Sequence, residues 1–156
     1  MSDDRGTEII PKLYIGNMYT ARNKFFMEEK NIGAVLNMTP DVPNFFSSPH
    51  SHIEYARCNV KDSQAREDSE NMYKYFPFIV NFIHKNLVLD QKNVLVHCHA
   101  GIQRSASAVA AYLMKTLKCT PDTAVKFIVS KRKIAFKEGT AVNFRDSLWW
   151  YYSDEV

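Results

Sequence analysis

A buried-looking strand in this sequence ends in a cysteine, which is followed at short spacing by a glycine, an arginine and a serine. Residues 94–107 read VLVHCHAGIQRSAS, so five residues separate Cys98 from Arg104. A loop of this length between a strand and a helix can turn its backbone N–H groups toward one phosphoryl group. We therefore expect a phosphate-binding loop, called the cysteine loop (98–104) below, in which the phosphate is held by His99, Ala100, Gly101, Ile102, Gln103 and Arg104.

The chemistry expected of this loop is nucleophilic. Inward N–H groups, the Arg104 guanidinium and a helix N-terminus all favour negative charge at the loop centre, so they favour the thiolate form of Cys98. A thiolate beneath a phosphate is an activated nucleophile, and Arg104 can hold two phosphate oxygens with its planar fork. Ser105 is placed to donate its hydroxyl to the sulfur. His97, inside the strand, is predicted to be a buried residue that supports the loop rather than a base.

Two histidines flanking a cysteine also suggest a metal site. A zinc site needs about four ligands, which usually occur as spaced pairs. His50, His52 and His84 provide no second pair at ligand spacing. We therefore predict no metal and no other cofactor.

Displacement at phosphorus is in line, so the leaving oxygen faces away from Cys98 and must be protonated from another loop. The carboxylates that follow a predicted strand near Cys58 are Asp62, Glu67 and Asp68. The residues by themselves leave all three open as the general acid.

The elements that must position these groups alternate between strand and helix. Apolar runs and alternation predict two short strands in 9–17 with a turn at Pro11, and further strands at 33–39, 53–60 and 93–97. Helical spacing predicts helices at 20–29, 71–87, 105–117, 120–132 and 143–152. Loops are expected at 40–51, with two exposed aromatics, and at 61–70; Pro77 should kink its helix or remove a hydrogen bond. This order predicts an α/β fold with a single central, mostly parallel sheet flanked by helices.

Length and composition restrict the remaining possibilities. The chain has 156 residues, a net charge of +3 and three cysteines. We expect an N-terminal tail at 1–8 and one domain at 9–156. The odd number of cysteines, with no signal peptide or membrane span, predicts an intracellular protein of the cytoplasm, the nucleus or both. Basic residues are dispersed, so nucleic acid is not an expected partner, and no pattern indicates an oligomeric state.

With these residues the sequence resembles the dual-specificity (VH1-like) group of cysteine-dependent protein phosphatases. The segment VLVHCHAGIQRSASAVAAYLMK is especially similar to the catalytic domain of MAP kinase phosphatases, and IIPKLYIGN, IGAVLNMTP and VKD follow the family's order. The resemblance implies a cysteine-phosphatase fold, no cofactor, and Asp62 as the general acid. It also implies hydrolysis of phosphotyrosine and phosphoserine/phosphothreonine through a phosphocysteine, with phosphorylated proteins such as a kinase as partners.

Two other functions remain as alternatives. A phosphatase for phosphoinositides or RNA 5′-phosphates would favour lysines inside the loop, where HAGIQ offers only His99. A phosphate-binding scaffold would lack the nucleophile or the acid, whereas Cys98, Arg104 and Asp62 are all present.

Overall fold

A five-stranded sheet forms the centre of the computed structural model, which describes residues 5–63, 65–137 and 144–156. The strand order is β1-β2-β5-β3-β4. β1 pairs with β2 in the antiparallel sense, and the other pairs are parallel. The predicted α/β class with one mostly parallel sheet is confirmed. The strands are β1 (Thr7–Ile10), β2 (Leu13–Gly16), β3 (Ile32–Asn37), β4 (Glu54–Arg57) and β5 (Asn93–His97).

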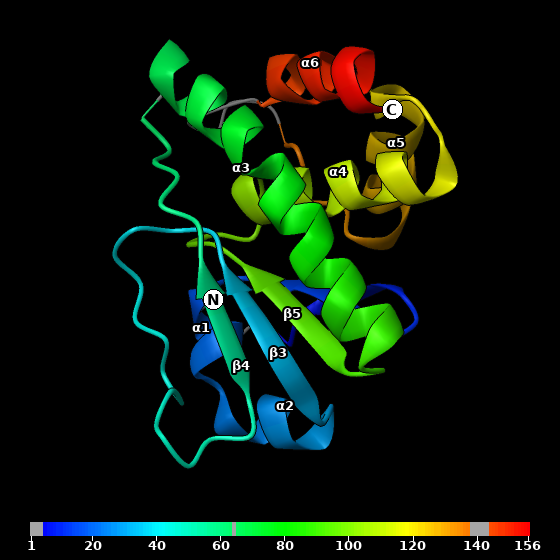
Figure 1. Ribbon diagram of the computed structural model, residues 1–156. Helices are drawn as coiled ribbons and strands as arrows, with labels where there is room; N and C mark the ends of the chain where they lie inside the picture. The colour runs from blue at the N-terminus through cyan, green and yellow to red at the C-terminus, as the bar shows by residue number, and fades with distance from the viewer. Residues whose placement is uncertain (1–4, 64, 138–143) are drawn as a thin grey trace.

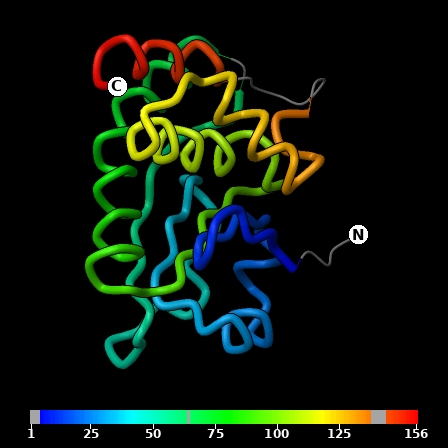
Figure 2. Tube along the Cα trace, turned by 90° about the vertical axis from the view of Figure 1, so that its right-hand side faces the viewer, coloured from blue at the N-terminus to red at the C-terminus, as the bar shows by residue number. Residues whose placement is uncertain are grey.

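Helices cover both faces of this sheet. Figures 1 and 2 show the long helix α3 on one side and the short helices α1 and α2 on the other, with α4, α5 and α6 gathered beyond one end of the strands. None of the helices within the described residues is both long and apolar enough to cross a membrane. The helices are α1 (Met18–Arg22), α2 (Lys24–Glu29), α3 (Arg66–His84), the π-helical turn η1 (Lys85–Leu89), α4 (Arg104–Leu117), α5 (Pro121–Lys131) and α6 (Arg145–Glu155).

Alternating side chains of the central strands supply two apolar cores. Because successive strand residues point to opposite faces, Val94 and Val96 enter the larger core with α3 and α4, whereas Leu95 enters the smaller one with α2. Phe45 and Phe46, expected to be exposed, are half-buried against the smaller core. The segment after β3 therefore covers part of the sheet and is not a free loop.

Several predicted boundaries differ from the structure. The helix expected at 20–29 is two helices, because the Asn23 side chain accepts a hydrogen bond from Phe26 N (3.1 Å) and caps a new helix. α3 begins at Arg66, inside the predicted loop 61–70, and continues through Pro77 without interruption. β1 begins at Thr7, two residues inside the predicted tail 1–8. α6 is described from Arg145, while residue 143, where its prediction started, lies outside the described residues.

The sheet brings four loops to one edge. Parallel strands have their carboxyl ends at the same edge, and the register pairs His97 at the end of β5 with Gly16 of β2 and Asn37 of β3. Asn37 is in turn paired with Arg57 at the end of β4. The loops that follow β2, β3, β4 and β5 therefore surround Cys98.

Candidate active site

Cys98 follows the central strand directly and is almost fully buried, with 2% of its surface exposed. Two groups reach its sulfur. Gly101 N donates to Cys98 Sγ at 3.3 Å, and Ser105 Oγ lies 3.2 Å from the same atom. These contacts stabilise a negatively charged sulfur, since each group has a proton to donate.

Three carbonyl groups of the cysteine loop accept hydrogen bonds from residues outside the loop. The carbonyl of His99 accepts from Met18 N at 3.0 Å, and that of Ile102 accepts from Phe136 N at 2.8 Å. The Gly101 carbonyl accepts from Arg132 Nε at 2.9 Å. Because the carbonyls are fixed on the outside of the loop, the N–H groups are left for its interior, which is the arrangement that binds anions.

Glycine is required at position 101 for two reasons. Its φ of +68° lies in the left-handed region that side chains rarely adopt. A Cβ at this position would also lie 2.5 Å from Arg132 Nη2 and 2.8 Å from the Gly16 carbonyl oxygen. The tight curl of the loop therefore depends on the absence of a side chain at Gly101.

Arg104 is the first residue of α4, and its side chain is buried at the edge of the loop, with 5% of the residue exposed. Its Nη1 donates to the Val60 carbonyl at 2.8 Å. Its Nε is buried and has no hydrogen-bond partner among the described residues. A buried guanidinium N–H without an acceptor is costly, so this donor is suited to an anion that enters the loop.

The loop after β4 carries Asp62, and Arg104 fixes that loop through the carbonyl of Val60, two residues earlier. The other two acid candidates have different environments. Asp68 is buried and its Oδ2 accepts from Ser63 N at 2.7 Å and from Ser63 Oγ at 2.6 Å. Glu67 is exposed in the first turn of α3. Asp68 therefore fixes the position of Ser63, the residue directly after Asp62. Asp62 itself lies in the loop that Arg104 contacts.

His97 is fully buried beneath the cysteine loop. Its Nδ1 lies 3.4 Å from the carbonyl oxygen of Cys98. Burial lowers the pKa of His97 to about 4, so the ring is neutral near pH 7. The His97 ring is therefore buried and neutral, contacts the loop backbone and provides no positive charge for the site.

The His99 side chain contacts an acidic residue outside the cysteine loop. Its Nε2 lies 3.0 Å from Asp41 Oδ1, on the segment that follows β3, and its backbone carbonyl accepts from Met18 N. Asp41 and Arg132 could not be selected as site residues from the sequence alone. Arg132 belongs to the short basic run SKRK (130–133), whose spacing does not indicate that it contacts Gly101.

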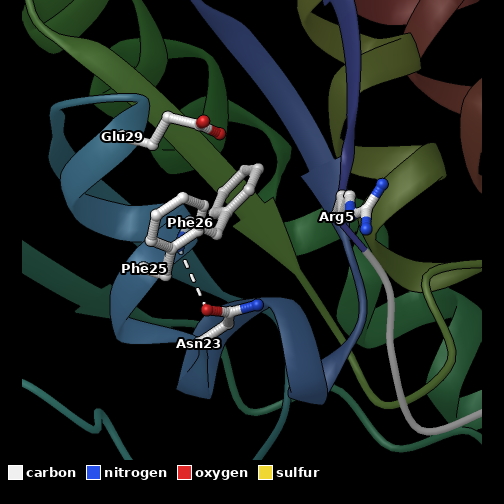
Figure 3. Close-up of a pocket in the computed structure, with 5 residues that line it drawn as sticks. All are labelled: Arg5, Asn23, Phe25, Phe26 and Glu29. Carbon is white, nitrogen blue, oxygen red and sulfur yellow. Dashed lines mark hydrogen bonds between the residues drawn. The ribbon is translucent and has the colours of Figure 1, made fainter.

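A pocket of about 320 Å³ lies elsewhere, between α2 and the residues before β1. Figure 3 shows Phe25, Phe26 and Glu29 on one side of it and Arg5 on the other. None of its lining residues belongs to the cysteine loop, so it is separate from the candidate site.

Within 5–63, 65–137 and 144–156, no three His, Cys, Asp or Glu residues are grouped so that they could hold a metal ion.

Comparison with known families and proteins agrees with this geometry. The family model "Dual specificity phosphatase, catalytic domain" matches residues 13–153. Dual specificity protein phosphatase 1-B of Xenopus laevis is 35% identical over 127 residues, which cover 81% of this chain and 32% of that protein. The Slingshot homolog protein phosphatase of the same species is 34% identical over 135 residues, covering 84% of this chain and 18% of the relative. The chain thus spans a third or less of the length of these relatives.

A solved structure shows the same architecture. The crystal structure of DUSP15 superimposes with a TM-score of 0.78 at 28% sequence identity, covering 94% of this chain and 86% of that one. The sequence and structural matches extend over nearly the whole sheet and its helices, and they include the cysteine loop and the loop that carries Asp62.

Proposed function

Because this chain belongs to the dual specificity phosphatase catalytic-domain family, we propose that it hydrolyses phosphotyrosine and phosphoserine/phosphothreonine in proteins. The reaction proceeds through a phosphocysteine on Cys98 and needs no metal or organic cofactor. The observation that carries the proposal is the cysteine loop itself, in which a buried sulfur accepts from Gly101 N and Arg104 Nε is a buried donor with no partner in the described chain.

In the first step the Cys98 thiolate attacks phosphorus, so a sulfur–phosphorus bond forms and the ester oxygen leaves. The loop N–H groups and the Arg104 guanidinium hold the three equatorial phosphate oxygens, over which the charge of the transition state is spread. Asp62 transfers its proton to the leaving oxygen from the opposite side. The leaving side chain therefore departs as a neutral alcohol or phenol.

In the second step water attacks the phosphocysteine. Asp62, now a carboxylate, accepts the water proton, and inorganic phosphate is released as the sulfur–phosphorus bond breaks. The sulfur departs as a thiolate, which Ser105 Oγ, 3.2 Å away, stabilises by donating a hydrogen bond. Asp62 is thereby protonated again and can act as the acid in the next cycle.

The test begins with turnover of para-nitrophenyl phosphate. We expect Cys98→Ser to abolish turnover while phosphate binding persists. The control Cys119→Ser, which changes a cysteine just after the end of α4, should retain turnover. Asp62→Ala should lower kcat on poor leaving groups by roughly 10²- to 10⁴-fold, whereas the matched Glu67→Gln should not. Turnover by Cys98→Ser near the wild-type rate would show that Cys98 is not the nucleophile. Loss of turnover in Glu67→Gln but not in Asp62→Ala would show that Asp62 is not the general acid.

Substrate class is tested by comparing phosphotyrosine and phosphothreonine peptides with phosphoinositides and RNA 5′-phosphates. We expect both peptides to be hydrolysed with higher kcat/KM than either alternative substrate. A higher kcat/KM for a phosphoinositide or an RNA 5′-phosphate would show that proteins are not the preferred substrate. An intracellular location, supported by the three free thiols, and a phosphorylated kinase as partner belong to the same proposal.

A further inference from the structure

The segment after β3 is held rigidly at the rim of the cysteine loop. Asn37 is fully buried, and its Nδ2 donates to the Val42 carbonyl at 2.7 Å. Its Oδ1 accepts from Thr39 N at 3.0 Å and from Thr39 Oγ1 at 2.8 Å. Arg57 Nη1 also donates to the Thr39 carbonyl at 2.8 Å. These bonds fix the backbone on both sides of Asp41.

Asp41 is the exposed charged residue of this fixed segment. Its side chain is 68% exposed, whereas Thr39, two positions earlier, and Val42, directly after it, are buried. Its Oδ1 lies 3.0 Å from Nε2 of His99, the residue directly after Cys98. The carboxylate is therefore accessible to solvent and is attached to the cysteine loop.

This position brings a negative charge to a site built for anions. The contact with His99 lowers the pKa of Asp41, and the charge of Arg104 lowers it further, so the carboxylate is ionised and lies within the field of the phosphate-binding arginine. A fixed carboxylate at this place repels additional negative groups of a substrate and attracts positive ones. The reacting phosphate, in contrast, is held by the loop N–H groups.

The other end of the cysteine loop has the opposite charge. The segment after α5 is bonded to it through Phe136 N and the Ile102 carbonyl (2.8 Å), and through Gln103 Nε2 and the Lys137 carbonyl (3.1 Å). Lys133 and Lys137 of this segment are exposed. The carboxylate beside His99 and the exposed lysines of the segment bonded to Gln103 thus belong to opposite ends of the cysteine loop.

Resting on the proposed function, we infer that Asp41 is a specificity-determining residue that selects phosphorylated protein segments with a lysine or arginine close to the phosphorylated residue. His99 is its positioning residue, because it holds the carboxylate at the start of the loop. The same contact discriminates against segments with a glutamate or aspartate at that position.

The experiment uses phosphotyrosine peptides in which each position from three before to three after the phosphotyrosine is in turn Lys, Ala or Glu. The measured quantity is the ratio of kcat/KM for the Lys and Glu peptides within each protein, so an effect common to all substrates cancels. Attraction and repulsion at an exposed carboxylate together correspond to roughly a fivefold to thirtyfold ratio at the selected position.

Asp41→Asn keeps an oxygen for His99 but removes the charge, so the ratio should fall to within about twofold of one. Asp41→Lys should invert it, and Glu28→Gln, a matched change on the exposed surface of α2, should leave the ratio at its wild-type value. A wild-type ratio near one at every position, or a ratio unchanged in Asp41→Asn, overturns the inference. Both results are distinct from failure of the proposed function, which is read from para-nitrophenyl phosphate turnover by the wild-type protein.

Discussion

Lowering the pH should destabilise this protein through His97, by an amount that follows from its burial. The pKa of His97 is about 4 in the folded protein because the buried ring cannot be solvated as a cation. In the unfolded chain the same ring has its ordinary pKa of about 6.5. The unfolded chain therefore binds a proton between these values while the folded protein does not, so the contribution is complete above about pH 6.5 and is lost as the pH falls toward 4.

The magnitude follows from the difference between the two pKa values. At about 1.4 kcal/mol per pKa unit, protonation of the unfolded chain should remove roughly 3 kcal/mol from the free energy of unfolding by pH 4, and about 2 kcal/mol by pH 5. The free energy of unfolding of a typical domain is only about 5–15 kcal/mol. This one histidine should therefore make the protein sensitive to mild acid.

Urea unfolding, followed by the fluorescence of Trp149 and Trp150, measures the effect at intervals from pH 7.5 to 4.5. His97→Asn retains a side-chain N–H group but does not titrate, so the difference in free energy of unfolding between wild type and variant isolates the histidine from the carboxylates. From pH 7.5 to 4.5, the free energy of unfolding of the wild type should fall by about 2–3 kcal/mol relative to that of His97→Asn. Parallel curves for the two proteins would refute a neutral, buried His97.

Four further results are expected. Arg104→Lys keeps the charge but lacks the planar fork, so its loss of kcat/KM should approach that of Arg104→Ala; a lysine variant with most of the activity would show that charge alone is sufficient. Gly101→Ala should lower both the melting temperature and the turnover of para-nitrophenyl phosphate, by strain of about 1–3 kcal/mol, and a normal melting curve would contradict the required loop geometry. Asp68→Asn should weaken the two hydrogen bonds from Ser63; in steady-state kinetics on aryl phosphates, the fold decrease in kcat should exceed the fold increase in KM. Burial raises the pKa of Cys58 to about 12, so iodoacetamide at pH 7.5 should leave Cys58 unmodified in the native protein, as checked by peptide mass mapping.

Much of the sheet could be predicted because its signals are local. The run NVLVH before Cys98 contains the apolar residues that a buried parallel strand requires, and the glycine and arginine spacing after it indicates a loop that binds an anion. The break at Asn23 was missed because a single asparagine within a helical pattern does not show that it caps a second helix. The early start of α3 was missed because its first turn is polar and exposed on most sides.

The supporting contacts of the site could not be predicted because they join residues distant in sequence. Arg132 and Gly101 are 31 positions apart, and Asp41 and His99 are 58 apart. A charged residue on a surface segment has the same sequence signature whether it is solvated or folds back onto a loop. Only the arrangement of the strands brings these residues into contact.

Arg132 has a consequence for the smallest fragment that can work as an enzyme. Besides the Gly101 carbonyl, its guanidinium donates from Nη1 to the Thr7 hydroxyl of β1 at 2.9 Å, whereas the residues shared with the family begin at position 13. A fragment that begins at position 13 would retain every residue of the reaction but lose the Thr7 hydroxyl, which accepts a hydrogen bond from the arginine that holds the cysteine loop. Supplying residues 5–12 as a separate peptide would then be expected to restore part of the lost rate by complementation.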